Sequence, residues 1–149
     1  MRKTGLEAAN YMKALSQHGA TGVRGFCLRT CRLAWDLPGD QPSAIAEWAS
    51  IPAKYRHTDP MKAPIGAPHF FRGGKYGHVV IQSELEGYVW STDAPTANKV
   101  GLVDIAWFRS HWKYDYLGWS SQFQNHVLPL GAEAPAAPAK KAPAKKVAK

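Results

Sequence analysis

Cysteine is scarce in this sequence, with only Cys27 and Cys31 among 149 residues. Two cysteines cannot build the framework of several disulfides that stabilises small secreted domains. Both lie in GFCLRTCRLAW (25–35), one helical turn apart, where their Cβ atoms do not readily converge to form a disulfide. They supply half of a zinc site, and no histidines fall at a recognised ligand spacing to complete it. Core packing by both cysteines and a nucleophilic role for one of them are the stronger interpretations.

Long apolar runs are also missing. No stretch approaches the roughly 20 apolar residues of a membrane-spanning helix. The positive N-terminus, MRKTGLEAANYMKALSQHG (1–19), is not followed by the continuous apolar segment of a signal peptide. We therefore expect a protein that is made in the cytoplasm and has no transmembrane segment. If it acts outside the cell, another agent must export or release it.

Acidic residues are outnumbered, since 11 Asp and Glu stand against 19 Lys and Arg for a net charge of +8. The stretch GAEAPAAPAKKAPAKKVAK (131–149) has five Lys, one Glu and no aromatic residue, so we expect a disordered tail after one folded domain over 1–130. A mildly basic body suits an acidic partner such as nucleic acid, an anionic wall polymer or a membrane surface. The tail suits either contact with an anionic polymer through charge alone or a solubilising role.

The spacing of apolar residues changes from helical to alternating along the chain. It predicts three helices, an irregular proline-rich stretch, four strands and an aromatic-rich end that begins with a helix. The expected helices cover 4–18, 26–35 and 43–50, the strands cover 67–71, 78–84, 87–93 and 99–105, and YLGWS (116–120) is expected to cap the domain edge. Helices followed by an antiparallel meander predict an α+β fold, with the helices packed on a small sheet.

Cys27 differs from Cys31 in its predicted surroundings. It follows the loop TGVRG (21–25) and lies where the second helix begins. Unpaired N–H groups and the positive end of the helix dipole lower a thiol pKa and favour the reactive thiolate. Arg24 and Arg29 act in the same direction. Cys31 lies one turn inside the helix, where we expect it to be buried as a small apolar residue.

A base and an orienting group for this thiol follow later in the sequence. His78 opens a strand after the glycine-rich turn in GGKYGHVVI (73–81), which places it at the edge of the sheet. With a two-residue turn at 85–86, the hairpin register puts His78 opposite Asp93, whose carboxylate would fix the tautomer of the imidazole. Ser91 is an alternative on the same face of the sheet.

This order of motifs resembles the NlpC/P60 and CHAP peptidases, which are papain-like cysteine hydrolases of bacterial cell walls. Those families have a cysteine that leads a helix, a strand of GD-x-V/A-F-F type and a GHVGI or GHVAI strand. GAPHFF (66–71) and GHVVI (77–81) correspond to the two strands, and the resemblance covers about residues 20–106. The sequence departs from the families at its cysteine, which lacks the usual Ser-Gly after it, and at Ala67, where an Asp is common.

The resemblance implies a catalytic site with Cys27 as the nucleophile, His78 as the base and Asp93 as the orienting residue, with no metal or other cofactor. It implies hydrolysis of an amide bond in bacterial peptidoglycan, as an endopeptidase or an amidase. His57 and Trp90 are candidates for substrate binding, since a loop histidine and an aromatic ring suit a cleft wall.

The same resemblance suggests where such an enzyme would act. A bacteriophage endolysin released through a holin pore, or an enzyme carried by the virion, would reach the wall without a signal peptide. The alternative is a catalytically inactive wall-binding or virion structural module with the same fold. We expect a monomer in either case.

Overall fold

The four strands expected from the sequence all form, and two further segments extend them into one sheet. The computed structural model describes residues 3–134, and the strands of its main sheet are β1 (Arg56–His57), β2 (Pro68–Arg72), β3 (His78–Gln82), β4 (Tyr88–Thr92), β5 (Val100–Asp104) and β6 (Asp115–Ser120). Their order is β1-β6-β2-β3-β4-β5, and every neighbouring pair is antiparallel. A separate ribbon pairs β7 (Gln122–Phe123) with β8 (His126–Val127).

The helices begin close to where the sequence predicts, which confirms the α+β class. They are α1 (Gly5–Gln17), α2 (Cys27–Ala34), α3 (Ala44–Ser50) and α4 (Trp107–Trp112), with 3₁₀ turns η1 (Ala53–Tyr55) and η2 (Pro60–Lys62) in the proline-rich stretch. Thr4 and Glu7 form a capping box at the start of α1, and the Ser43 hydroxyl accepts a hydrogen bond from an N–H of α3. None of the helices within residues 3–134 is long and apolar enough to cross a membrane.

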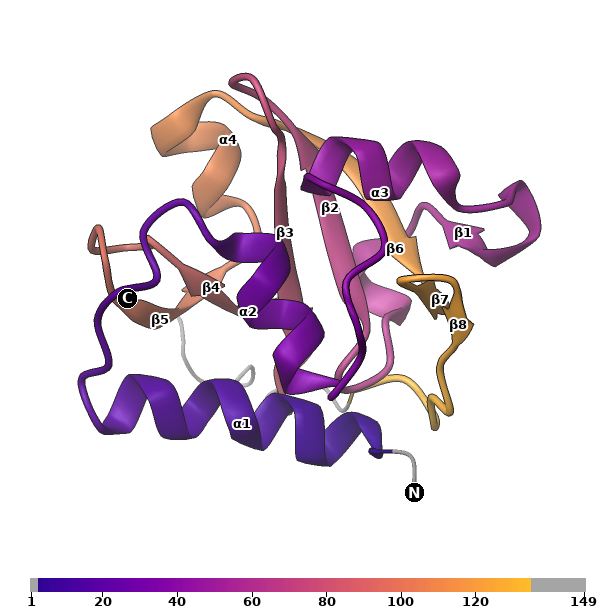
Figure 1. Cartoon of the computed structure of the whole chain (residues 1–149), viewed down its shortest axis with the longest axis horizontal. Coiled ribbons are helices and arrows are strands. Elements are labelled where there is room, and N and C mark those ends of the chain that lie inside the picture. The colour runs from indigo at the N-terminus through magenta and orange to yellow at the C-terminus, as the bar shows by residue number, and fades with distance from the viewer. Residues whose placement is uncertain (1–2, 135–149) are drawn as a thin grey trace.

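Alternation along the strands divides the core between the two faces of the sheet. Phe70 and Val79 pack with residues of α1 and α2 on one face, whereas their neighbours Phe71 and Val80 pack with α4 on the other. Figure 1 shows α2 lying over β3 on the first face, with α1 running below it. His78 shares a face with Val80, so its ring lies on the α4 side, while α2 approaches the same strand from the other side.

The segment at 116–120 is not a cap, as the sequence predicted, but most of β6. This strand lies inside the sheet, with Trp119 opposite His69 of β2 on one side and His57 of β1 on the other. Gly118 interrupts its apolar pattern because a Cβ there would lie 2.5 Å from the His57 carbonyl oxygen. The sequence of this strand therefore lacks a regular alternation of apolar residues. Its partners β1 and β2 lie more than forty residues earlier in the sequence, so no local pattern predicts that β6 pairs with them.

The packed body extends beyond the predicted boundary at residue 130. Glu133 forms a β-bridge with Pro64, and the Ala134 N–H donates a hydrogen bond to the Ala63 carbonyl. The rest of the expected disordered tail, residues 135–149, lies outside the described residues.

Candidate functional site

Cys27 is the first residue of α2 and is half-buried. The loop before it turns sharply at Gly22 and Gly25, which have φ of 80° and 75° in the region that glycine adopts freely. The N-cap residue offers no side-chain acceptor, so the first N–H groups of α2 are open to other acceptors. Cys31 is fully buried, and its thiol donates to the Val79 carbonyl at 3.5 Å. Both thiols are free, so the two cysteines form no disulfide.

Two hollows meet at Cys27. The α3-side hollow, of about 630 Å³, lies between the start of α2 and the loop that leads to α3. The α4-side hollow, of about 660 Å³, lies between the start of β3 and the end of α4, and its lining includes His78. Tyr76, which is 60% exposed, lines both hollows with Cys27. Cys27 thus lines a hollow on each side of the start of α2, and we call the two hollows together the groove.

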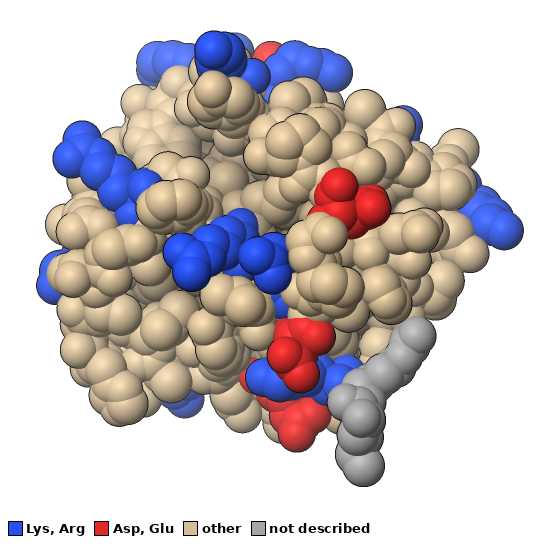
Figure 2. Space-filling model, viewed as in Figure 1, with Lys and Arg blue, Asp and Glu red and all other residues tan. Residues whose placement is uncertain are grey.

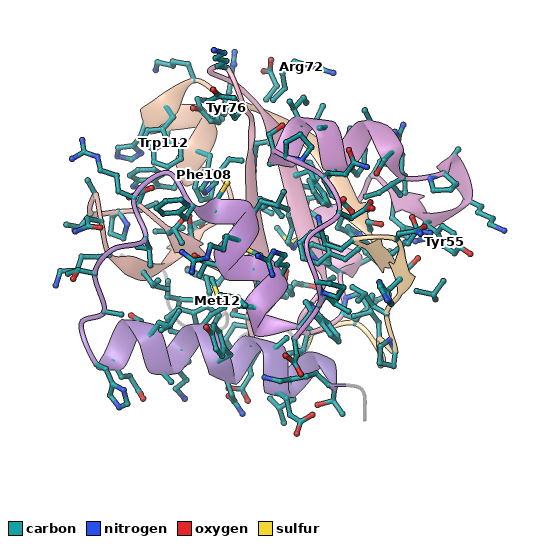
Figure 3. All side chains as sticks on the ribbon, viewed as in Figure 1. Met12, Tyr55, Arg72, Tyr76, Phe108 and Trp112 are labelled. Atoms are coloured by element: carbon teal, nitrogen blue, oxygen red, sulfur yellow. The ribbon has the colours of Figure 1, made fainter. Side chains whose placement is uncertain are left out.

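His78 is the first residue of β3, and its ring packs among aromatic rings at the α4-side hollow. Its ring centroid lies 5.1 Å from that of Trp112 and 5.4 Å from that of Phe108. Figure 3 shows Tyr76, Phe108 and Trp112 gathered on one side of the molecule, between α4 and the start of α2. These rings restrict the imidazole to one orientation and remove most of its contact with water.

Ser91 of β4 fixes the tautomer of this imidazole. The Ser91 Oγ lies 2.8 Å from His78 Nε2, and its hydroxyl donates to the Thr92 carbonyl at 2.7 Å. Because a serine hydroxyl has one hydrogen and gives it to that carbonyl, it accepts the hydrogen bond from Nε2–H. The nitrogen that can take a proton is therefore Nδ1, and the orienting group is neutral.

Asp93 does not hydrogen-bond His78, which corrects the prediction that it orients the imidazole. The predicted register is present between β3 and β4, but Asp93 leaves the strand direction with φ of 62°. Its carboxylate turns to the loop before Cys27, where it accepts hydrogen bonds from the Gly25 N–H at 2.9 Å and the Asn98 N–H at 2.6 Å. The register of the hairpin predicts that His78 and Asp93 lie opposite each other, but it does not predict that β4 ends before Asp93.

Burial dominates the electrostatics of the site. It raises the pKa of Cys27 to about 11, and the charge of Asp93 adds to this, against hydrogen bonds from the backbone of Val79 and Leu28 that lower it. Burial also lowers the pKa of His78 to about 4, although the charge of Asp93 opposes this. The lowered thiol pKa expected at a helix start is not found, because lost hydration outweighs the backbone hydrogen bonds. At neutral pH the site holds a neutral thiol and a neutral imidazole.

This electrostatic state predicts slow alkylation of Cys27 at neutral pH. A pKa of about 11 against an ordinary value of 9.0 leaves about a hundredfold less thiolate than an ordinary cysteine has at pH 7. We expect the iodoacetamide rate, followed by intact mass, to rise about tenfold per pH unit between pH 7 and 9. Cys31→Ser is the matched control and should leave this profile unchanged. A rate at pH 7 equal to that of free cysteine would contradict the expectation.

His57 and Trp90, the expected substrate-binding residues, are not brought to Cys27. His57 stacks on Trp119 with ring centroids 4.0 Å apart and lines a separate hollow of about 550 Å³. Trp90 lies on the opposite face of β4 from Ser91 and packs against the core below α1 and α2. Their residue types suggested a cleft wall, but the sequence did not show which edge or face of the sheet they occupy.

Several residues at the site were not singled out in the sequence. Tyr76 and Tyr114 line the α4-side hollow, and Asn98 binds the loop before Cys27. Tyr76 follows the glycine-rich turn, a place where an exposed aromatic residue signals contact with a ligand or partner. Asn98 has φ of 63°, which is common for asparagine in turns, and its long-range partners are not visible in the sequence.

A second buried histidine belongs to a polar network on β2, β3 and β6. His69 Nδ1 lies 2.8 Å from the Tyr116 hydroxyl, and Nε2 lies 2.7 Å from Gln82 Oε1. The Gln82 amide group donates to three carbonyls, so its Oε1 can only accept, and His69 carries its proton on Nε2. Burial lowers the pKa of His69 to about 4. The network stabilises the sheet and does not line the groove at Cys27.

No group of three or more His, Cys, Asp and Glu side chains in the described part of the chain is arranged to hold a metal ion. None of the protein-family models, curated proteins or solved structures compared with this chain matches it. A relation to the NlpC/P60 and CHAP peptidases therefore depends on the motifs and on the arrangement of Cys27, His78 and Ser91 alone.

Proposed function

We propose that the protein is a papain-like cysteine amidase or endopeptidase that cleaves an amide bond in bacterial peptidoglycan. The observation that carries the proposal is the meeting of a helix-leading cysteine and a strand-leading histidine at one hollow, with Ser91 fixing the histidine tautomer. The resemblance implies Cys27 as the nucleophile, His78 as the base and Asp93 as the orienting residue. Ser91 replaces Asp93 in the last of these roles.

In the first step, the Cys27 Sγ attacks the amide carbonyl carbon while its proton moves to His78 Nδ1. The thiol and the imidazole are both neutral at rest, so this transfer accompanies the attack and does not precede it. The N–H groups of Cys27 and Leu28 at the start of α2, which hydrogen-bond the Cys27 sulfur at rest, stabilise the oxyanion that forms. The C–N bond then breaks, and the imidazolium gives its proton to the leaving amine nitrogen.

In the second step, water cleaves the thioester that remains on Cys27. His78 Nδ1 takes a proton as the water oxygen bonds to the carbonyl carbon, and the C–S bond breaks with return of that proton to sulfur. The products are an amine and a carboxylic acid, and the net reaction consumes one water. The hydrogen bond to Ser91 keeps Nδ1 as the reacting nitrogen throughout both steps.

The charge around the groove suits the acidic stem peptides of peptidoglycan. Arg29 lines the α3-side hollow, and Arg24 and Lys75 line the α4-side hollow. Within residues 3–134 none of these three side chains forms an ion pair with a carboxylate. Figure 2 shows lysine and arginine side chains gathered over α2 and along the rim above it. Each hollow also has one carboxylate in its lining, Asp40 on the α3 side and Asp93 on the α4 side, but lysine and arginine outnumber it in both, so carboxylates on a bound peptide would meet a net positive charge on both sides of Cys27.

The alternative function is a wall-binding or virion module of the same fold without turnover. The raised pKa of Cys27 and the lowered pKa of His78 favour it, because they disfavour the thiolate–imidazolium pair that many cysteine hydrolases use. In either form, the protein would reach the wall through a holin pore or as part of a virion.

Digestion of purified peptidoglycan with mass analysis of the soluble products tests the proposal. We expect fragments whose masses correspond to the uptake of one water per bond cut, with a new amine and a new carboxyl end. The position of the new ends identifies the bond and separates an amidase from an endopeptidase. Binding to the wall without any soluble fragment would instead support the alternative, and neither binding nor release would overturn both.

A further inference from the structure

Four consecutive backbone N–H groups before Cys27 point at side chains from a distant turn. The Asn98 Oδ1 accepts hydrogen bonds from Gly22 at 2.9 Å, from Val23 at 3.1 Å and from Arg24 at 3.3 Å. These residues lie more than seventy positions from Asn98 in the sequence, so the contacts are tertiary and not part of a local turn. One amide oxygen thus gathers three successive N–H groups of the loop.

Asp93 completes this arrangement and connects it to Asn98. Its Oδ2 accepts from the Gly25 N–H at 2.9 Å, the fourth group in the row, while its Oδ1 accepts from the Asn98 N–H at 2.6 Å. Neither acceptor is free to move alone, because Asp93 holds the backbone of Asn98. We call Asp93 and Asn98 together the loop clamp.

The loop clamp lies on the same hairpin as the group that orients His78. Strand β4 carries Ser91, ends at Thr92 and is followed at once by Asp93. The hairpin therefore holds the imidazole through one residue and the loop before Cys27 through another, two positions later. Apart from the buried Val23 side chain, the loop has few other fixed points, since Gly22 and Gly25 favour no single conformation and Thr21, Arg24 and Phe26 are exposed.

We propose that Asp93 and Asn98 are positioning residues that set where the Cys27 thiol lies relative to His78. This inference rests on the proposed function for its catalytic consequence, but the positioning itself does not require turnover. It also gives Asp93 a role different from the one the sequence suggested. The carboxylate holds the nucleophile loop and leaves the imidazole to Ser91.

Hydrogen exchange and alkylation test the loop clamp without any assumption about the substrate. In Asn98→Ala we expect the amides of residues 22–24 to exchange at least about tenfold faster, because their shared acceptor is gone. Alkylation of Cys27 by iodoacetamide should rise several-fold as its loop opens. Asn98→Asp keeps an acceptor oxygen in a residue that tolerates positive φ, and should restore slow exchange. Thr96→Ala, an exposed change in the same turn, should match the wild type.

Asp93→Asn separates the charge of the loop clamp from its hydrogen bonds. The amide can accept only one of the two N–H groups that the carboxylate accepts, so exchange at Gly25 should rise. Loss of the negative charge should also move the pH profile of Cys27 alkylation to lower pH, because that charge raises the thiol pKa. The shift of the profile reports the charge alone, so exchange at Gly25 as slow as in the wild type would contradict the positioning role of Asp93.

The outcomes distinguish this inference from the proposed function. Unchanged exchange at 22–24 in a folded Asn98→Ala protein overturns the loop clamp, even if the wild type degrades peptidoglycan. Faster exchange and alkylation support it, even if no peptidoglycan is cut. Where the wild type is active, the clamp predicts a loss of about tenfold or more in kcat with little change in KM, because the substrate contacts remain. Should Asn98→Ala not fold, the exchange rates of Asp93→Asn decide the question.

Discussion

Replacing Cys27 by serine is expected to reduce the release of peptidoglycan fragments by at least about 10³-fold while leaving wall binding intact. The hydroxyl of serine is far less acidic than a thiol, and the His78 imidazole, with its pKa near 4, is too weak a base to activate it. The measurement compares soluble fragments from the same peptidoglycan preparation for both proteins. His78→Ala should lose activity to a similar extent, because nucleophile and base act as a unit.

Two further variants make this experiment specific. Cys31→Ser keeps a donor for the Val79 carbonyl and should retain most of the activity. Ser91→Ala should lose about 10²-fold, since the imidazole keeps its place among aromatic rings but loses the partner that fixes its tautomer. Full activity in Cys27→Ser would exclude the thiol mechanism. Equal activity in Ser91→Ala and the wild type would exclude the orienting role.

The second large effect is a loss of stability in mild acid. His69 and His78 are buried and neutral, each with a pKa lowered from 6.5 to about 4. Between pH 6.5 and about 4, the unfolded chain binds up to two more protons than the folded one. The contribution of the two neutral histidines to the free energy of unfolding is therefore fully present above pH 6.5 and decreases as the pH falls towards 4. Each histidine accounts for about 3 kcal/mol over this interval, and together they give a slope of roughly 2.5 kcal/mol per pH unit.

Urea unfolding between pH 7 and 4.5 measures this slope. His69→Gln and His78→Gln each remove one of the two buried titrating groups, so each variant should halve the slope. Glu47 acts in the opposite sense, because burial raises its pKa and the folded state therefore gains from its protonation as the pH falls. A stability that is constant between pH 6.5 and 4.5 would contradict the predicted burial of both imidazoles.

The sequence predicted those parts of the fold that local patterns determine. The spacing of apolar residues predicted the helices, and short apolar, β-branched and aromatic runs predicted the strands β2 to β5. Strand β6 was missed, because Gly118 breaks its alternation and its place in the sheet depends on contacts with distant strands. Such pairings have no signal within a short window of sequence.

The candidate site shows the same division. Cys27 and His78 could be selected because each begins an element, a position that local residues define. The role of Asp93 could not be predicted, since its side chain serves a loop almost seventy residues earlier. The position of Cys27 at a helix start predicted a low thiol pKa. Burial raises that pKa instead, and the burial of Cys27 depends on the whole packed structure.

The interior place of β6 also determines when the site can form during synthesis. Residues 27, 78 and 91 are synthesised well before residues 115–120. Strand β2 lies between β3 and β6, so it has only β3 as a partner until β6 has been made. A nascent chain that ends near residue 106 would present the bare edge of β2, which readily pairs with other chains. The chain would thus complete its main sheet only after its last large strand has left the ribosome, and a chain shortened before β6 would keep residues 27, 78 and 91 yet expose an edge prone to aggregation.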